Sequence, residues 1–515
     1  MKQSTVQRAA IWSVAIWPAL NFIAHNWTDV VNDGVAVLAG LALISLCLGA
    51  LGYAFHYLMS KRDAGGFAVV CTVLGICLFF GYSLVHHVAA GLMSRLGLSM
   101  APSLAWLLLV VIVAVPVIFL RRHEGLQVAA TVFSFSATAL ALGQLAFIAF
   151  SRPQLRAEAP AIAAELPADA PPGAAGANVY YILLDEYAGQ AGLQEFSGFD
   201  NRTFVGEMAR RGFVDATAIG PGIAHSNYLV TQQALGAIFA LDYSLTEDPR
   251  TWRQPWRLFP NLIDGAQAPA LVRGFKSAGY SVWQTFNTWT GCSGRHLRCL
   301  GGQGSLNLDQ VTMSFVAPTP LGRMVALSFG RREDGLAVID DQLEAMVASK
   351  QSFFVFVHSL ITHPPFYLGA DCNTRDLDQS DVEGNRRNRE AYIGALACAN
   401  RRVIGLVDRI QRDDPNAIVV VQGDHGSELT IDWDMPIPRW PDSFIRERAS
   451  FLNLIKAPPV CKLWLDRSIA QINTARFVLG CARRQKPQYL EDRTYLSSYS
   501  KVDGNYVIVP LESLN

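Results

Sequence analysis

The sequence predicts a chain of two unlike parts, five transmembrane helices followed by an α/β domain with a central, mostly parallel sheet covered by helices. The first part is predicted by five long apolar runs within the first 150 residues. The second is predicted by short apolar runs that alternate with helical patterns after about residue 178. Ionisable residues that follow three of these short runs indicate where the α/β domain would carry a functional site.

The five apolar runs each approach the roughly 20 residues that a helix needs to cross a bilayer. A buried helix of a soluble domain explains one such run, but not five in series. The runs cover residues 9–25, 34–58, 67–92, 104–120 and 128–150. We therefore expect a transmembrane domain at 1–151, a tether rich in Ala and Pro at 152–177, and an extracytoplasmic domain at 178–515.

Basic residues flank alternate runs, which predicts the orientation of the helices. Lys2 and Arg8 precede the first run, and further basic residues lie at 61–62 and 121–123. The other two loops hold fewer Lys and Arg residues. The amino terminus is therefore expected inside the cell and the second domain outside, as in a multi-pass protein of a bacterial inner membrane with its second domain on the periplasmic side.

Cysteine usage supports an oxidising compartment for the second domain. Six cysteines follow the tether, and an even number favours disulfides over free thiols. Other pairings stay open, but sequence order suggests Cys292 with Cys299, Cys372 with Cys398, and Cys461 with Cys481.

The second domain reads as strands that alternate with helices. Its strand candidates are nearly uninterrupted apolar runs, as expected where both faces of a sheet are buried. They cover residues 178–184, 352–357 and 417–421, with helical patterns at 201–211, 340–349 and 389–411. This alternation is typical of a helix-covered, mostly parallel sheet.

Acids and imidazoles follow each of the three strand candidates. Taken alone, each group could equally well lie in an ordinary surface turn without a functional role. The carboxyl ends of parallel strands, however, meet at one edge of a sheet, where carboxylate and imidazole ligands could bind a divalent metal. The residues are Asp185 and Glu186 after the first run, His358 and His363 after the second, and Asp424 and His425 after the third.

Four short segments then occur in the order typical of a known superfamily. They are Leu-Asp-Glu-Tyr at 184–187, Ser-Asn-Tyr-Leu-Val-Thr at 226–231, Thr-His-Pro-Pro-Phe at 362–366 and Gly-Asp-His-Gly at 423–426. In these the chain resembles the sulfatase-like branch of the alkaline phosphatase superfamily, which includes lipoteichoic acid synthases and lipid A phosphoethanolamine transferases. Those enzymes also carry five membrane helices ahead of an extracytoplasmic catalytic domain.

The resemblance implies one divalent metal ion, zinc or manganese, and a set of ligands for it. Sulfatases have two consecutive acids at the first strand, which match Asp185 and Glu186. The transferases have a single Glu there, which matches Glu186 best. Asp424 and His425 match the later ligand pair. Whether Asp185, Glu186 or both would bind the metal is left open at this point.

The resemblance also implies a nucleophile and a substrate-binding residue. Thr231 matches a metal-bound hydroxyl that takes up the transferred group covalently, and His363 matches a histidine that contacts the substrate or the leaving group. Thr231 could also be a helix N-cap, and Ser226 is the alternative nucleophile. A histidine fixed in a Pro-rich loop is the alternative for His363.

The implied function is a membrane enzyme that moves phosphoethanolamine or phosphoglycerol from a phospholipid to an envelope lipid or glycan. A phosphatase or phosphodiesterase that uses the same site, and a non-catalytic membrane scaffold, are the alternatives. Sulfate-ester hydrolysis through formylglycine is not expected, since the chain has no Cys-x-Pro-x-Arg or Ser-x-Pro-x-Arg segment. With 43 basic and 43 acidic residues, the chain gives no reason to expect nucleic acid as a partner.

Overall fold

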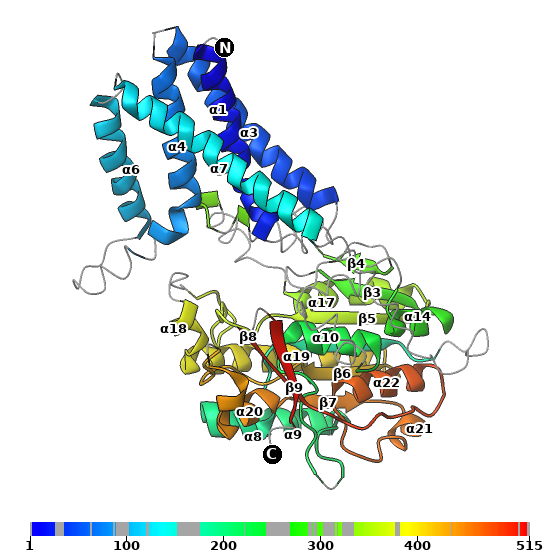
Figure 1. Ribbon diagram of the computed structural model, residues 1–515. Coiled ribbons are helices and arrows are strands. Elements are labelled where there is room, and N and C mark those ends of the chain that lie inside the picture. The colour runs from blue at the N-terminus through cyan, green and yellow to red at the C-terminus, as the bar shows by residue number, and fades with distance from the viewer. Residues whose placement is uncertain are drawn as a thin grey trace. The chain divides into compact units, whose positions relative to one another are not determined.

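The computed structural model divides the chain into two compact units (Figure 1). The helical unit comprises Met1–Ala157 and Leu308–Arg331, and the sheet unit comprises Glu158–Asn307 and Arg332–Asn515. The structure describes residues 3–25, 35–61, 64–85, 88, 102–119, 123–151, 176–220, 222–243, 268–286, 292, 296–301, 315–316, 318–321, 334–375, 382–433, 435–502 and 505–511. The predicted tether at 152–177 lies outside these residues up to position 175.

Helices occupy all five of the predicted apolar runs. They are α1 (Gln3–His25), α3 (Val35–Ser60), α4 (Gly65–Phe80), α6 (Pro102–Phe119) and α7 (Glu124–Ser151). Among the residues described, two segments are long and apolar enough to cross a membrane, Leu38–Ser60 and Glu124–Phe147. Membrane crossing by the other three helices stays a prediction.

The helical unit has its own small core. Helix α1 packs against α3, α4 and α7, and the core includes Val14 of α1 and Val69 of α4. The ring of Phe315, which is far from these helices in sequence, lies 5.2 Å from the rings of both Phe22 and Phe80. The chain therefore returns to this unit after it has begun the sheet unit.

Seven described strands form one sheet in the order β2-β7-β6-β1-β5-β3-β4. Strand β7 is antiparallel to both of its neighbours, β2 and β6, and the other four strand pairs are parallel. The sheet is therefore mostly parallel, as predicted. The strands are β1 (Val179–Leu184), β2 (Val214–Asp215), β3 (Ser281–Thr285), β4 (Arg298–Leu300), β5 (Phe353–Ser359), β6 (Ile418–Gly423) and β7 (Asn453–Lys456).

The three predicted strands, β1, β5 and β6, lie side by side at the centre of the sheet. Leu184 at the end of β1 is in register with Ser359 of β5 and Gly423 of β6, so the three strands end level with one another. Every residue of β1 is buried, with Ile182 in the core on one face and Tyr181 in the core on the other. Burial on both faces is why these strands read as uninterrupted apolar runs.

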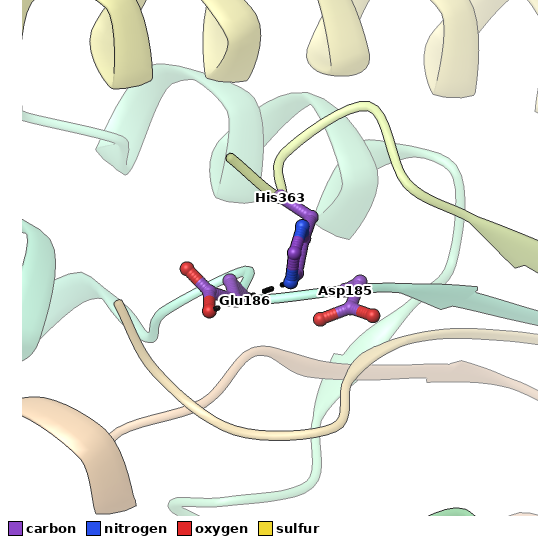
Figure 2. A group of neighbouring side chains, drawn as sticks. All are labelled: Asp185, Glu186 and His363. Atoms are coloured by element: carbon purple, nitrogen blue, oxygen red, sulfur yellow. Dashed lines mark ion pairs between the residues drawn. The ribbon is translucent and has the colours of Figure 1, made fainter. Parts of the chain in front are cut away.

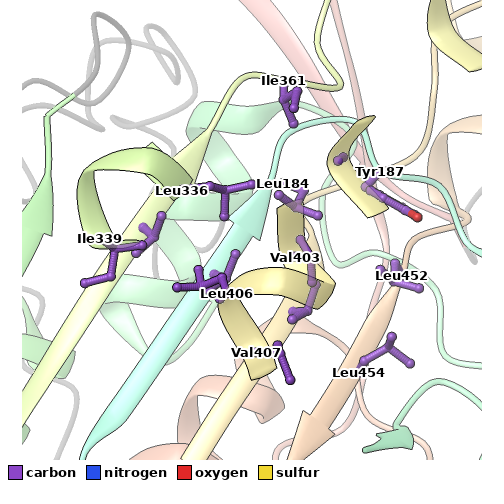
Figure 3. Packing of buried hydrophobic residues seen from close by; sticks show 14 of the residues in the cluster. Leu184, Tyr187, Leu336, Ile339, Ile361, Val403, Leu406, Val407, Leu452 and Leu454 are labelled. Carbon is purple, nitrogen blue, oxygen red and sulfur yellow. The ribbon is translucent and has the colours of Figure 1, made fainter. Parts of the chain in front are cut away.

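Helices cover both faces of the sheet (Figure 1). The cores place α9 (Arg202–Arg210), α17 (Gly335–Ala348) and α19 (Arg389–Asp413) on one face, and α10 (Thr231–Ala240), α14 (Ala270–Ser277) and α22 (Gln471–Ala482) on the other. Figure 3 shows Val403, Leu406 and Val407 of α19 beside Leu184 of β1 and Leu454 of β7. The spacing of three and four residues along α19 turns one apolar face to the sheet.

Shorter elements complete the sheet unit. They are α8 (Gln190–Gly192), the π-helix Leu193–Ser197, α18 (Val382–Arg386), the 3-10 helix Ile437–Arg439, α20 (Asp442–Ala449), α21 (Pro459–Lys462), and the hairpin of β8 (Tyr495–Val502) with β9 (Asn505–Pro510). Three disulfides join the cysteines in the pairs that sequence order suggested, Cys292–Cys299, Cys372–Cys398 and Cys461–Cys481.

Candidate active site

Two neighbouring strand ends, those of β1 and β6, bring the predicted carboxylates together. Asp424 Oδ1 accepts hydrogen bonds from the backbone amides of Glu186 and His425, each 3.0 Å long. These two bonds fix the carboxylate at the end of β6. Its other oxygen, Oδ2, is buried, receives no hydrogen bond from the described part of the chain, and lies 3.0 Å from Nε2 of His425.

The hydrogen bonds of His425 determine which ring nitrogen faces the site. Its Nδ1 lies 3.1 Å from the carbonyl oxygen of Gly426, which can only accept, so Nδ1 carries the hydrogen. In the neutral ring Nε2 therefore presents a lone pair toward Oδ2 of Asp424. Nη2 of Arg448, at 3.2 Å, and the hydroxyl of Thr231, at 3.0 Å, lie where they can donate to this lone pair. Oδ2 of Asp424, by contrast, receives no hydrogen bond from the described residues. A carboxylate oxygen and an imidazole nitrogen at this separation are ligand types that suit a divalent cation.

Thr231 is the first residue of α10 and is buried. Its Oγ1 lies 3.0 Å from Nε2 of His425 and 3.4 Å from Oδ1 of Asp185. The N-cap position is occupied by Val230, whose backbone is extended, so the N-cap alternative for Thr231 is wrong. Its hydroxyl instead faces the ligand candidates, at the helix end where backbone amides favour negative charge.

Asp185 is fully buried and is held from a third strand end, that of β5. His358 Nε2 lies 3.1 Å from Asp185 Oδ2. Burial would raise the pKa of Asp185, but His363, His358 and His425 together hold the pKa well below its usual range. The carboxylate is therefore charged at neutral pH.

Glu186 faces a different set of partners. Its backbone is left-handed, with φ of 62°, and its Oε1 forms an ion pair of 2.8 Å with Nη1 of Arg448. In Figure 2 the ring of His363 lies between Glu186 and Asp185, with its Nε2 4.0 Å from Glu186 Oε1. Burial and the nearby Glu428 raise the pKa of Glu186, and Arg448 opposes this rise.

The ligand atoms form two groups that share Asp185. One is Asp185, Asp424 and His425, and the other is Asp185, Glu186 and His363; within each group the atoms lie within 4.8 Å of one another. The hydroxyl of Thr231 lies by Asp185, which both groups share, and by His425 of the first group. Two carboxylates, an imidazole and a hydroxyl suit zinc or manganese better than calcium.

Ser226, the alternative nucleophile, has a different role. Its hydroxyl lies 2.5 Å from the carbonyl oxygen of Tyr228 and 2.8 Å from that of Asp424, and it accepts a hydrogen bond of 2.9 Å from Gln471. These bonds hold the backbone beneath Asp424. The geometry favours Thr231 over Ser226.

Arg448 is the residue of this site that sequence reasoning missed. It lies in α20, its side chain is 2% exposed, and its Nη2 is 3.2 Å from Nε2 of His425. Its Nε and Nη1 donate to the carbonyl oxygens of Leu229 and Gly426. The surrounding sequence, Arg-Glu-Arg-Ala, reads as an exposed charged helix, so no local pattern indicated a buried guanidinium.

Comparison with known proteins gives a family match and several solved structures of low similarity. The family model described as Sulfatase matches residues 223–439. No curated protein sequence matches the chain. Among solved structures, the C-terminal periplasmic domain of EcEptC from Escherichia coli is 16% identical, with 68% of this chain and 97% of that chain covered and a TM-score of 0.40.

Two further structures are similar to the same degree. The integral membrane protein lipooligosaccharide phosphoethanolamine transferase A (EptA) from Neisseria meningitidis is 15% identical, with 93% of this chain and 95% of that chain covered and a TM-score of 0.38. The lipoteichoic acid synthase LtaP from Listeria monocytogenes is 12% identical, with 65% and 81% covered and a TM-score of 0.36. The family match confirms the resemblance found in the sequence: residues 223–439 match the Sulfatase family.

Proposed function

We propose that the chain is a metal-dependent transferase of a bacterial envelope that moves phosphoethanolamine or phosphoglycerol from a phospholipid to an envelope lipid or glycan. One observation carries the proposal. The hydroxyl of Thr231, buried at the amino end of α10, lies against His425 and Asp185, where a nucleophile and ligand set would have to meet.

The proposed metal ligands come from Asp185, Glu186, Asp424 and His425, joined by Thr231 itself. A divalent cation there, zinc or manganese, would lower the pKa of the threonine hydroxyl and offset negative charge on the phosphoryl group. The residues already supply the geometry. The Asp424 carboxylate is fixed by two backbone amides, and the His425 ring is fixed by its bond to Gly426.

The reaction takes place in two displacements. In the first, Thr231 Oγ1 forms a bond to phosphorus and gives its proton to water, while the bond from phosphorus to the diacylglycerol oxygen breaks. His363, whose side chain is 17% exposed, is placed to give that oxygen a proton. In the second, a hydroxyl of the acceptor attacks phosphorus and gives its proton to His363, while the bond from phosphorus to Thr231 Oγ1 breaks and Oγ1 takes up a proton from water.

The helical unit fits a lipid donor. Two of its helices are long and apolar enough to cross a membrane, and a site tethered to a membrane meets phospholipid headgroups at high local concentration. The three disulfides of the sheet unit fit an extracytoplasmic location for the site.

The test is covalent labelling of the full chain in detergent with phosphatidylethanolamine or phosphatidylglycerol that is radiolabelled in the headgroup. We expect label on the wild type and none on Thr231→Ala. Metal analysis of the variant should show that it still binds metal. Thr203→Ala, at an exposed position of α9, is the matched control and should label as the wild type does. Label on Thr231→Ala would contradict the proposal, and rapid release of free headgroup without acceptor would indicate a hydrolase.

A further inference from the structure

The first turn of α22 brings a buried amide to the candidate site, from a helix that carries none of the proposed ligands. The amide belongs to Gln471, the first residue of α22, which is fully buried. Its Nε2 donates to the backbone carbonyl oxygen of Asp424 at 2.7 Å and to the hydroxyl oxygen of Ser226 at 2.9 Å. Its Oε1 accepts a hydrogen bond of 2.9 Å from the backbone amide of Asn227. One side chain thus contacts both the turn after β6 and the segment that leads to Thr231.

The chemistry of these partners fixes the orientation of the Gln471 amide. A backbone N–H can only donate and a backbone carbonyl can only accept, so Oε1 faces Asn227 and Nε2 faces Asp424. If the amide were turned over, an oxygen would face a carbonyl oxygen and an NH₂ group would face an N–H. The side chain therefore satisfies both segments in this one arrangement.

The backbone of α22 and the side chain of Asn227 make the contact reciprocal. The N-cap residue of α22 is Ala470, which has no side chain that can accept from the first amides of the helix. Asn227 Oδ1 takes the place of such a cap, since it accepts a hydrogen bond of 3.0 Å from the backbone amide of Ile472. The start of α22 and residue 227 are thus joined by two hydrogen bonds that run in opposite directions.

The two anchored points lie close to the groups that would react. The carbonyl of Asp424 belongs to the peptide that joins Asp424 to His425, so its position determines where both side chains start. The anchored amide of Asn227 lies four residues before Thr231, and the residues between them are fully buried. His425 Nε2 and Thr231 Oγ1 lie 3.0 Å apart although they are 194 positions apart in the sequence. This short distance depends on two segments that Gln471 joins.

We infer that Gln471 is a positioning residue for the transfer reaction, because its amide ties the turn with Asp424 to the segment with Thr231. The inference deepens the proposed function and rests on it for the reaction. Among the described residues, its side-chain hydrogen bonds go to two backbone groups and the hydroxyl of Ser226, so its effect passes through the segments that it joins. A displacement of about 1 Å between reacting groups can slow an enzyme by about 100-fold, so this tie should act on the rate more than on substrate binding.

Asn473, two residues further along α22, offers a matched control. It is 1% exposed and also makes three side-chain hydrogen bonds, each 2.8 Å long. Its Nδ2 donates to the carbonyl oxygen of Leu490 and to Asp492 Oδ1, and its Oδ1 accepts from the backbone amide of Leu490. These partners lie outside the candidate site. Removal of this amide should therefore lower stability without displacing the site.

The first measurement is the rate of covalent labelling of the full chain in detergent, with whichever headgroup-labelled phospholipid labels the wild type. Gln471→Met and Asn473→Leu fill the space of the two amides without their hydrogen bonds. We expect the maximum rate to fall at least about tenfold in Gln471→Met, with the lipid concentration for half-maximal rate unchanged to within about threefold. Asn473→Leu should keep the wild-type rate. A wild-type rate in Gln471→Met, or the same loss in both variants, would overturn the inference.

Thermal midpoints and zinc titrations separate positioning from stability. The midpoint should fall by a similar amount in the two variants, because each loses three buried hydrogen bonds. Zinc affinity of the chelator-stripped protein should fall about tenfold in Gln471→Met alone, since the turn that it holds carries Asp424 and His425. If Gln471→Met does not fold, Gln471→Asn, whose amide is one methylene shorter, replaces it in every assay. An equal fall of zinc affinity in Asn473→Leu would contradict the inference.

Amide hydrogen exchange tests the tie without lipid or metal. In Gln471→Met, exchange should become faster at residues 227–231 and 424–426, whereas in Asn473→Leu it should become faster at 490–492. Unchanged exchange at 227–231 and 424–426 in Gln471→Met would show that the amide holds neither segment. If the wild type takes no label from either lipid, the transferase assignment fails, while faster exchange of both segments in Gln471→Met alone would still establish the tie between them.

Discussion

At the scale of single residues, the turn after β6 depends on the absence of a side chain at Gly426. A Cβ atom there would lie 1.9 Å from the carbonyl oxygen of Glu447 and 2.6 Å from that of Ser450. The close approach brings the turn with Asp424 and His425 against the end of α20, the helix that carries Arg448. The glycine is required here by lack of space.

We therefore expect Gly426→Ala to separate this turn from α20. The free energy of unfolding of the sheet unit should fall by about 1–3 kcal/mol, as for other overpacked sites, and zinc affinity should fall with it. Denaturant unfolding and zinc titration of the full chain measure the two effects. At Gly405, on the exposed side of α19, a Cβ meets no atom within 4 Å, so Gly405→Ala should instead stabilise the helix by about 0.5–1 kcal/mol. No loss in Gly426→Ala would show that the turn can shift freely.

Residues of the site differ in how far the sequence could predict them. Asp424 and His425 were predictable because both follow a strand that is apolar throughout and lie between glycines. The contact of Glu186 with Arg448 was not, because it depends on a backbone angle and on a residue 262 positions away from Glu186. A contact of that separation leaves no local pattern in a single sequence.

At the scale of elements, the central strands were predicted correctly because their burial on both faces removes polar residues from them. Helix α19 was predicted from its apolar face, to within two residues at its carboxyl end. The short strands β2 and β4, of two and three residues, were not predicted, because two or three residues are too few to show a periodic pattern. The Cys372–Cys398 disulfide joins α19 to the segment that follows β5, across a separation of 26 residues.

This disulfide should stabilise the sheet unit mainly by restricting the unfolded chain. For a loop of this length, replacing both Cys372 and Cys398 by Ala should lower the free energy of unfolding by about 3 kcal/mol. The thermal midpoint of the full chain in detergent, measured without reductant, checks this value. Cys47→Ala, which removes a free thiol of α3, serves as the control and should have no such effect. A midpoint that is unchanged in the Cys372/Cys398 variant would mean that the bond constrains nothing in the unfolded state.

At the scale of the whole molecule, the sequence predicted two parts, and the structure divides into a helical and a sheet unit. The segment at 308–331 was assigned to the second part by sequence order, whereas its described residues pack with the helical unit. Sequence order alone could not indicate this, because Phe315 finds its aromatic partners on helices that precede it by more than 200 residues.

The predicted orientation of the five helices can be tested on the full chain. Reporter fusions that are active only outside the cytoplasm should be inactive when joined after residue 61 or residue 123 and active when joined after residue 178. The same protein should stay with the membrane fraction after washing at alkaline pH. Activity after residue 123, or extraction by the wash, would contradict a five-helix anchor with an external catalytic domain.

The alignment of β1 between β5 and β6 has a consequence for the order in which the protein is made. The first pair of acids is synthesised more than 230 residues before Asp424 and His425, and the guanidinium that pairs with Glu186 follows later still. These groups can therefore meet only once the chain has been made as far as His425. A metal bound by them, as we propose, would be selected late, from the ions available where folding finishes.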